Sequence, residues 1–99
     1  MPFVWINGEF RDEADDVLTL RDAGLLHAAG VFTTMLARDG SVVLLDQHLR
    51  RLRTSCQTLG IPQAQSDAEL KQAVTELLQR NDLGDARLRL SVTRGQSVR

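Results

Sequence analysis

The spacing of apolar residues changes twice along the chain and divides it into three regions. The first 45 residues contain short strand-like runs. From there the apolar positions follow helical spacing: Leu45, Leu49, Leu52, Cys56 and Leu59. Near the C-terminus they alternate with polar residues, as in a strand with one buried face: Ala86, Leu88, Leu90 and Val92. This order of strands, helices and a strand predicts an α+β domain, with two helices packed on one face of a mainly antiparallel sheet.

The first 30 residues contain one predicted hairpin. Phe3 to Ile6 is rich in β-prone residues, and Asn7-Gly8 can adopt the positive φ angles of a tight turn before Glu9-Phe10 returns as a second strand. The acidic segment 11–19 then predicts an irregular loop and a short strand at its end. Segment 20–30 holds a brief apolar group between glycines, which predicts a helix of one or two turns.

A second hairpin is predicted before the helical region. Val31 to Leu36 and Ser41 to Leu45 are strand-like runs, and Asp39-Gly40 between them is a strong short-range hairpin signal. Gly30-Val31-Phe32 begins the first of these strands in this interpretation.

Two helices should follow. The first is predicted over residues 46–59, where Asp46 can accept hydrogen bonds from first-turn amides and Gly60 suits a left-handed end. Pro62 prevents its continuation. Ser66 and Glu69 have the spacing of a capping box at the start of the second helix. The buried stripe of that helix is predicted to be Leu70, Val74, Leu77 and Leu78.

Length and charge narrow the class of protein. A chain of 99 residues forms one domain, here 1–99, and a formal net charge of -1 with mixed signs argues against binding nucleic acid or an anionic membrane. No apolar run approaches the length of a membrane span, and no secretion signal is evident, so we expect a soluble cytoplasmic protein. The single cysteine, Cys56, excludes an internal disulfide or a cysteine zinc cluster, and its helical register predicts a packed thiol.

Two clusters of basic residues are candidate anion sites. Segment 48–53 reads His-Leu-Arg-Arg-Leu-Arg, and an arginine beside the buried stripe, such as Arg51 or Arg53, could direct its guanidinium into a cleft. A solvated basic helix face gives the same pattern, and composition does not separate the two. Segment 93–99 is a glycine-containing loop with two arginines at a strand end, typical of a binding loop or of an ordinary polar turn. His27 and His48 lack the partners of a metal site, so no metal is predicted.

Five sequence blocks occur in the order typical of class IV aminotransferases, and the chain resembles that family over essentially its whole length. The family contains branched-chain aminotransferases, D-amino-acid aminotransferases and aminodeoxychorismate lyases, all with fold type IV pyridoxal phosphate domains. The blocks are Trp5 to Phe10, Asp22 to Phe32, His48 to Leu52, Leu59 to Ile61 and Val92 to Gly95.

The resemblance implies roles for five residues. Arg51, the arginine directly before leucine in the His-x-x-Arg-Leu block, would bind the cofactor phosphate. Phe32 and His27 stand where the family lines the substrate side of the cofactor. Arg99 matches a substrate-carboxylate arginine of D-amino-acid aminotransferases, and Arg94 is the second candidate for that role.

Departures from the family pattern affect the expected substrate more than the expected fold. The family often has arginine at Ala23, glycine and aspartate at Ala28-Ala29, and glutamate at Thr33. Leu36 occupies a place where branched-chain enzymes tend to have arginine, which makes that subclass less favoured. The only lysine is Lys71, which lies on a helix outside the family motifs and is rejected as catalytic.

The resemblance therefore implies the N-terminal cofactor- and substrate-positioning domain of a pyridoxal-phosphate transaminase. The Schiff-base lysine belongs to the family's C-terminal catalytic domain, so we expect no activity from these 99 residues alone and no cofactor bound by them alone. The implied partners are that domain, a second copy in a homodimer, and a small amino-acid or 2-oxo-acid substrate. The alternatives are the equivalent domain of an aminodeoxychorismate lyase and a non-catalytic, self-associating module.

Overall fold

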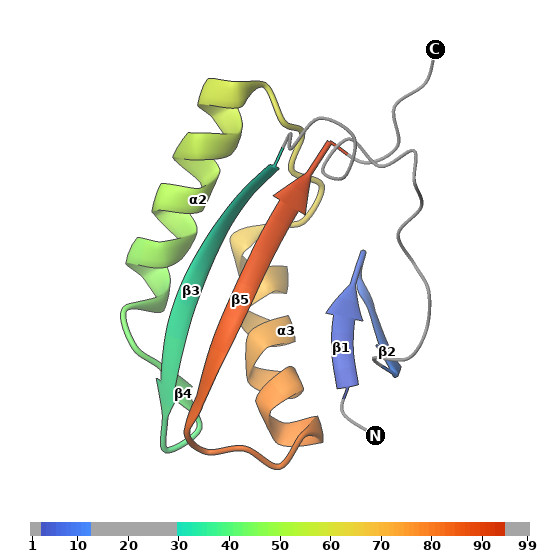
Figure 1. The fold of residues 1–99 in the computed structure, drawn as a ribbon, viewed down its shortest axis with the longest axis vertical. Helices are drawn as coiled ribbons and strands as arrows, with labels where there is room; N and C mark the ends of the chain where they lie inside the picture. The colour runs from blue at the N-terminus through green and yellow to red at the C-terminus, as the bar shows by residue number, and fades with distance from the viewer. Residues whose placement is uncertain (1–2, 13–29, 95–99) are drawn as a thin grey trace.

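A computed structural model of the chain describes residues 3–12 and 30–94, which form two small antiparallel sheets and two helices (Figure 1). The predicted α+β class is confirmed. The elements expected within segment 13–29 lie outside the described residues. The described elements are β1 (Phe3–Ile6), β2 (Glu9–Asp12), β3 (Gly30–Arg38), β4 (Ser41–Val42), α2 (Leu45–Leu59), α3 (Asp67–Arg80) and β5 (Ala86–Thr93).

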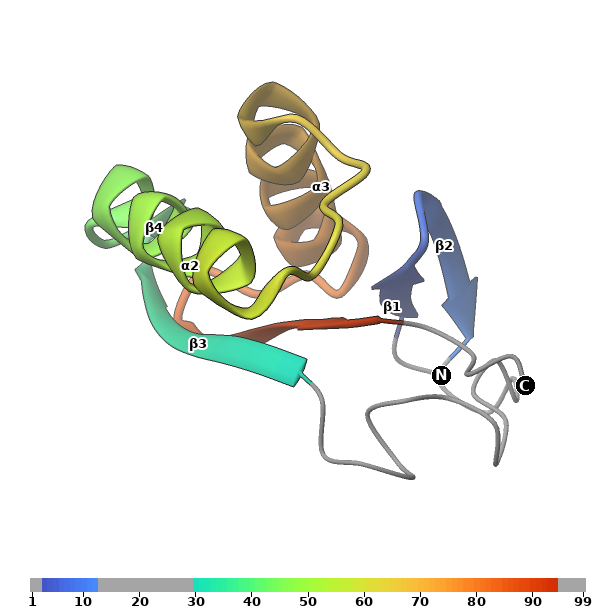
Figure 2. The same ribbon diagram turned by 90° about the horizontal axis from the view of Figure 1, so that it is seen from above.

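The larger sheet has the strand order β4-β3-β5 and two unlike faces. β3 pairs with β5 along its length up to Ala37, whereas β4 pairs only with Ala37 and Arg38. Both helices lie on one face of this sheet, as Figure 2 shows. Side chains alternate along β3, so Thr33, Met35 and Ala37 are buried toward the helices and their neighbours are exposed.

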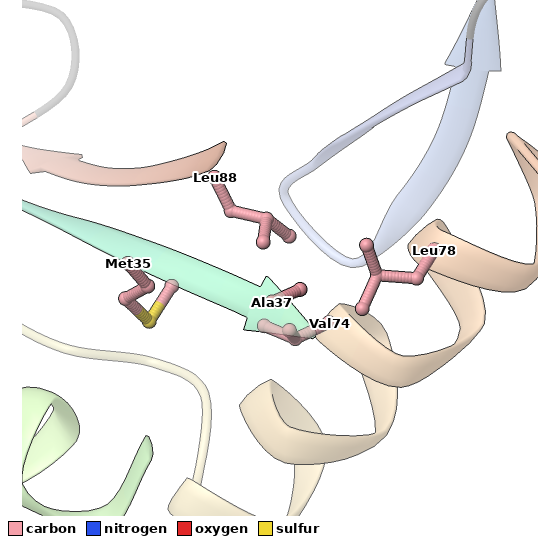
Figure 3. Close-up of a cluster of buried hydrophobic side chains, with 5 residues drawn as sticks. All are labelled: Met35, Ala37, Val74, Leu78 and Leu88. Carbon is pink, nitrogen blue, oxygen red and sulfur yellow. The ribbon is translucent and has the colours of Figure 1, made fainter. Parts of the chain in front are cut away.

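The core lies between the larger sheet and the helices. Met35 comes from β3 and Leu88 from β5, and Figure 3 shows them with the α3 residues that share their cluster. Met35 is 1% exposed, so its side chain is fully removed from water. The alternation predicted for β5 is confirmed, although Leu88 is the only buried residue in that strand. The core cluster consists of Met35, Ala37, Val74, Leu78 and Leu88.

The first predicted hairpin is confirmed and is longer than expected. Asn7 and Gly8 have φ of 53° and 89°, as a tight turn between β1 and β2 requires. β2 continues through Arg11 and Asp12, which the sequence placed in a loop, because each pairs with a residue at the start of β1. Asn81 fastens this hairpin to α3: its Oδ1 accepts from Phe3 N at 2.7 Å and its Nδ2 donates to Phe3 O at 3.0 Å.

The second hairpin is confirmed, but its return strand ends early and the cap predicted for α2 is wrong. β4 stops at Val42, and after one more bond across the hairpin, from Val43 N to Leu36 O, the left-handed backbone of Leu44 leads into the helix. The N-cap is Leu44, at φ 56°, with no side-chain cap. Asp46 is the second residue of α2, and its carboxylate forms an ion pair with Lys71. The predicted end is confirmed, with Gly60 at φ 67°.

α3 begins at the predicted capping box. Glu69 N donates to Ser66 Oγ at 3.2 Å, and Ser66 N donates to Glu69 Oε1 at 3.3 Å. These bonds satisfy amide groups that a helix start otherwise leaves without partners. The stripe of α3 is buried at Leu70, Ala73, Val74 and Leu78, with Leu77 only partly buried.

Candidate functional site

Two of the predicted site residues lie in or next to β3. Phe32 lies on the open face of the sheet, where its side chain is 60% exposed. Arg51 is exposed on α2, and Figure 1 shows that helix running alongside β3 on the side away from β5. Within the described part of the chain, residues 30–35 have no strand partner on that side. Arg51 thus lies on the helix side of the sheet, and Phe32 lies on the open side of the same strand.

Arg51 is connected to the sheet through His48. The Oγ1 atom of Thr33 lies 2.7 Å from Nδ1 of His48, and Nη2 of Arg51 lies 3.4 Å from the same nitrogen. The first distance is that of a good hydrogen bond, and the second is a long contact. The sequence treated His48 as structural, and the structure gives that role a partner, the buried Thr33.

The three arginines of the basic segment have different surroundings. Arg53 donates to Asp67 Oδ1 at 2.5 Å, an ion pair that ties α2 to the start of α3. Arg50 is exposed on the same helix. Arg51 has its polar contact with His48 alone among the residues described here, so most of its five donor hydrogens remain available to a ligand. The geometry therefore favours Arg51 over Arg53 as an anion-binding group.

The open face of the sheet carries a basic residue that the sequence reasoning missed. The guanidinium of Arg89 lies 4.1 Å from the ring centroid of Phe32, a cation–π arrangement across β3 and β5. Arg89 is the register partner of Thr34, so the two residues lie on the same face as Phe32. The alternation of β5 identified Arg89 as outward-facing. Only the pairing register shows that Phe32 is its neighbour.

Of the remaining predicted site residues, the structure describes only Arg94. Arg94 Nη2 donates to Leu59 O at 2.6 Å, so its guanidinium binds a carbonyl at the end of α2 that the helix itself leaves free. His27 and Arg99 lie outside the described residues. In the ranges 3–12 and 30–94, no group of three or more His, Cys, Asp or Glu side chains is placed to hold a metal ion. Among the same residues, no helix is long and apolar enough to cross a membrane.

Lys71 is held by an ion pair that opposes Schiff-base chemistry. Its ammonium group hydrogen-bonds to the Asp46 carboxylate, and this bond and the attraction between the charges raise the pKa of Lys71 and lower the pKa of Asp46. A lysine that attacks a carbonyl needs a neutral amine, which a raised pKa makes scarcer. This environment agrees with the rejection of Lys71 as a catalytic residue.

Comparison with known proteins identifies the family. The family model described as amino-transferase class IV matches residues 30–99, more than half of the chain. The chain belongs to this family. The resemblance of the five sequence blocks is thereby confirmed, and the strand edge beside Arg51 belongs to a class IV aminotransferase fold.

Two relatives that match nearly all of this chain are named for different activities. A protein of Methanocaldococcus jannaschii, named as a candidate branched-chain-amino-acid aminotransferase, is 41% identical over 92 residues, covering 93% of this chain and 32% of the relative. An aminodeoxychorismate lyase of Bacillus subtilis is 36% identical over 96 residues, covering 95% of this chain and 33% of the relative. The chain thus spans about a third of the length of the curated relatives it matches.

A solved structure gives the same result at the level of the fold. The PLP-bound form of a hypothetical aminotransferase from Mycobacterium tuberculosis superposes with a TM-score of 0.83 and 30% sequence identity. The match covers 96% of this chain and 34% of that chain. The arrangement of helices and sheet described above is therefore that of an N-terminal part of a class IV aminotransferase.

Proposed function

We propose that these 99 residues are the cofactor-phosphate- and substrate-positioning domain of a pyridoxal-phosphate-dependent class IV aminotransferase, inactive alone. The observation that carries the proposal is the guanidinium of Arg51, which is linked to β3 through His48 and Thr33 and has no other polar contact among the described residues. Family membership and the PLP-bound relative from M. tuberculosis support the choice of ligand.

The chemistry of Arg51 suits a phosphate group. A guanidinium presents planar, paired donors to phosphate oxygens and keeps its charge at every physiological pH. A hydrogen bond to a charged group contributes about 1.5–3 kcal/mol, enough to orient a cofactor without supplying any covalent step. When bound, pyridoxal phosphate supplies the carbonyl group and electron-withdrawing ring that amino-group transfer requires, with a lysine from the rest of the protein.

The open face of the sheet suits the substrate side of that site. Phe32 offers an exposed apolar ring, and Arg89 beside it offers a cation for the carboxylate that amino acids and 2-oxo acids share. If Arg89 held the substrate carboxylate beside the ring of Phe32, the reacting carbon of the substrate would be oriented although neither residue contacts it. His27, Arg94 and Arg99 remain candidates for the same binding surface.

The partners we propose are the C-terminal catalytic domain and a second copy of the protein. Residues 30–35 have no strand partner on one side within the described ranges, and Phe32 among them is exposed, so further protein could pair with and cover this surface. Light scattering of the full-length protein tests the homodimer directly. A monomeric mass at working concentration would contradict it.

The phosphate role is tested by two matched substitutions in the full-length protein. Arg51→Gln should weaken the binding of pyridoxal 5′-phosphate, followed by absorbance titration, by about 10- to 150-fold, the loss of one charge-assisted bond. Arg53→Gln, on the same helix but committed to Asp67, should leave the affinity close to that of the wild type. Equal losses in both variants, or no loss in Arg51→Gln, would contradict the role of Arg51. The isolated chain should show no turnover with amino acids and pyruvate or 2-oxoglutarate.

Aminodeoxychorismate lyase is the second candidate, favoured by the 36% identity to the B. subtilis enzyme. The two activities differ in their need for an amino acceptor. Consumption of aminodeoxychorismate by the full-length protein without an added 2-oxo acid would support the lyase. Amino transfer that depends on a 2-oxo acid, with no reaction of aminodeoxychorismate, would support the transaminase.

A further inference from the structure

A hydroxyl group is buried where the rest of the strand is apolar. Thr33 is 6% exposed and is the only buried polar residue in the described parts of the chain. The next two residues of β3 that face the helices, Met35 and Ala37, are apolar members of the core. Burying a hydroxyl is unfavourable unless it forms a hydrogen bond, and the partner available to Thr33 is Nδ1 of His48. Packing therefore fixes the position of the Thr33 hydroxyl, the buried end of this contact.

The neighbours of Nδ1 determine which ring nitrogen of His48 carries the proton. Arg51 approaches Nδ1 with a guanidinium nitrogen, which donates hydrogen bonds and cannot accept them. A proton on Nδ1 could be accepted by the Thr33 hydroxyl, but it would also face the Arg51 donor, which accepts nothing. With Nδ1 unprotonated, its lone pair accepts from the Thr33 hydroxyl at 2.7 Å and faces the Arg51 donor at 3.4 Å. Of the two tautomers, the one with its proton on Nε2 therefore lets Nδ1 accept from both neighbours.

We propose that Thr33 and His48 are positioning residues that orient Arg51 toward the cofactor phosphate. This inference rests on the proposed function of Arg51. His48 and Arg51 are three residues apart on α2, the spacing at which helix side chains are neighbours. Arginine has a long flexible side chain, and a contact that restricts it before the ligand arrives reduces the entropy lost on binding. Thr33 holds the ring, and the ring holds one side of the guanidinium.

Paired substitutions in the full-length protein separate this role from a packing role. Thr33→Val keeps the shape and removes the hydroxyl, whereas Thr33→Ser keeps the hydroxyl and removes a methyl group. His48→Leu removes the acceptor, whereas His48→Asn can present an amide oxygen near the position of Nδ1. We expect Thr33→Val and His48→Leu to weaken pyridoxal 5′-phosphate binding by about 2- to 12-fold, the effect of one lost hydrogen bond. Thr33→Ser and His48→Asn should retain most of the affinity.

A spectroscopic measurement reports on the contacts of His48 with Thr33 and Arg51 without any ligand. Nitrogen-15 shifts of the histidine rings, recorded at mildly alkaline pH, should show His48 with Nδ1 unprotonated, its signal identified by its absence in His48→Asn. In Thr33→Val that tautomer preference should weaken. A His48 ring protonated on Nδ1, or equal cofactor affinity in Thr33→Val and the wild type, would overturn the inference. Failure of the proposed function looks different, because Arg51→Gln would then bind the cofactor normally whatever the tautomer of His48.

Discussion

At the scale of single residues, the thiol of Cys56 is predicted to be inert in the folded chain. Its side chain is 2% exposed, and burial raises the pKa of the thiol, with the positive charge of Arg53 opposing this to a lesser degree. Thiolate is the reactive form, so both access and ionisation are reduced. We expect slow modification by a disulfide reagent under native conditions and a rise to the unfolded rate in strong urea. Equal rates with and without urea would show that the thiol is accessible.

The ion pair between Asp46 and Lys71 predicts a stability contribution that depends on pH. Folding lowers the pKa of Asp46, so its contribution is complete above the ordinary value of 3.8 and is lost as the pH falls through the lower folded value. Folding raises the pKa of Lys71, so its contribution is complete below 10.5 and is lost as the pH rises through the higher folded value. The pair therefore stabilises the fold most between these limits.

Asp46→Asn tests this dependence in urea unfolding experiments. The variant should be slightly less stable than the wild type near neutral pH, because exposed pairs contribute little. The difference should shrink toward both extremes of pH. Asp82→Asn, at an exposed carboxylate with no ion pair in the described chain, should show no such profile. A constant difference across the pH range would mean that the pair does not stabilise the fold.

Some site residues could be recognised from the sequence alone, and others could not. A motif identifies Arg51, and its position on α2 follows from helical spacing. Arg89 was missed because its neighbour Phe32 is 57 positions away, as their numbers show, and is brought close only by the register of β3 and β5. Thr33 was noted as a departure from the family, but its partner His48 comes from another element. Contacts between elements depend on tertiary packing, which spacing along the chain does not report.

At the scale of elements, the start of α3 is predicted to depend on its capping box. Ser66→Ala removes the side-chain acceptor for Glu69 N and should lower the free energy of unfolding by about 0.5–2 kcal/mol. Ser66→Asp supplies another good cap and should restore most of it. Gln72→Ala, on the exposed side of α3, is the control for general effects on the helix. Urea unfolding followed by circular dichroism measures all three, and equal stability of the alanine and aspartate variants would refute the cap.

The two helix starts show why one boundary was predictable and the other was not. Ser66 and Glu69 form a local pair, so the sequence contains all the information for the cap of α3. Leu44 is apolar and exposed, with a left-handed backbone, and no local signal marks it as the residue before α2. It comes directly after the last bond across the second hairpin, from Val43 N to Leu36 O, so this boundary lies where the pairing with β3 ends. The β-prone residues of this segment predicted a return strand through Leu45, whereas the strand ends at Val42.

At the scale of the whole molecule, the larger sheet has one face that packs against the helices and one open face that carries the proposed substrate-binding residues. Adjacent residues of β3 sample the two faces: Met35 is 1% exposed beneath the helices, and Leu36 is 48% exposed on the open face. Met35→Ala should destabilise the chain by about 2–5 kcal/mol, because it leaves a cavity in the core. Leu36→Ser should change the free energy of unfolding by no more than about 0.5 kcal/mol.

In the full-length protein, Leu36→Ser should affect substrate binding and Met35→Ala should affect stability alone. Leu36 shares the open face with Phe32 and Arg89, so Leu36→Ser should alter KM for the amino-acid or 2-oxo-acid substrate while leaving the melting temperature nearly unchanged. Met35→Ala should lower the melting temperature and leave KM of the remaining folded enzyme unchanged, because Met35 faces the helices. If Leu36→Ser lowers the melting temperature as much as Met35→Ala and leaves KM unchanged, the open face packs against protein and does not meet the substrate.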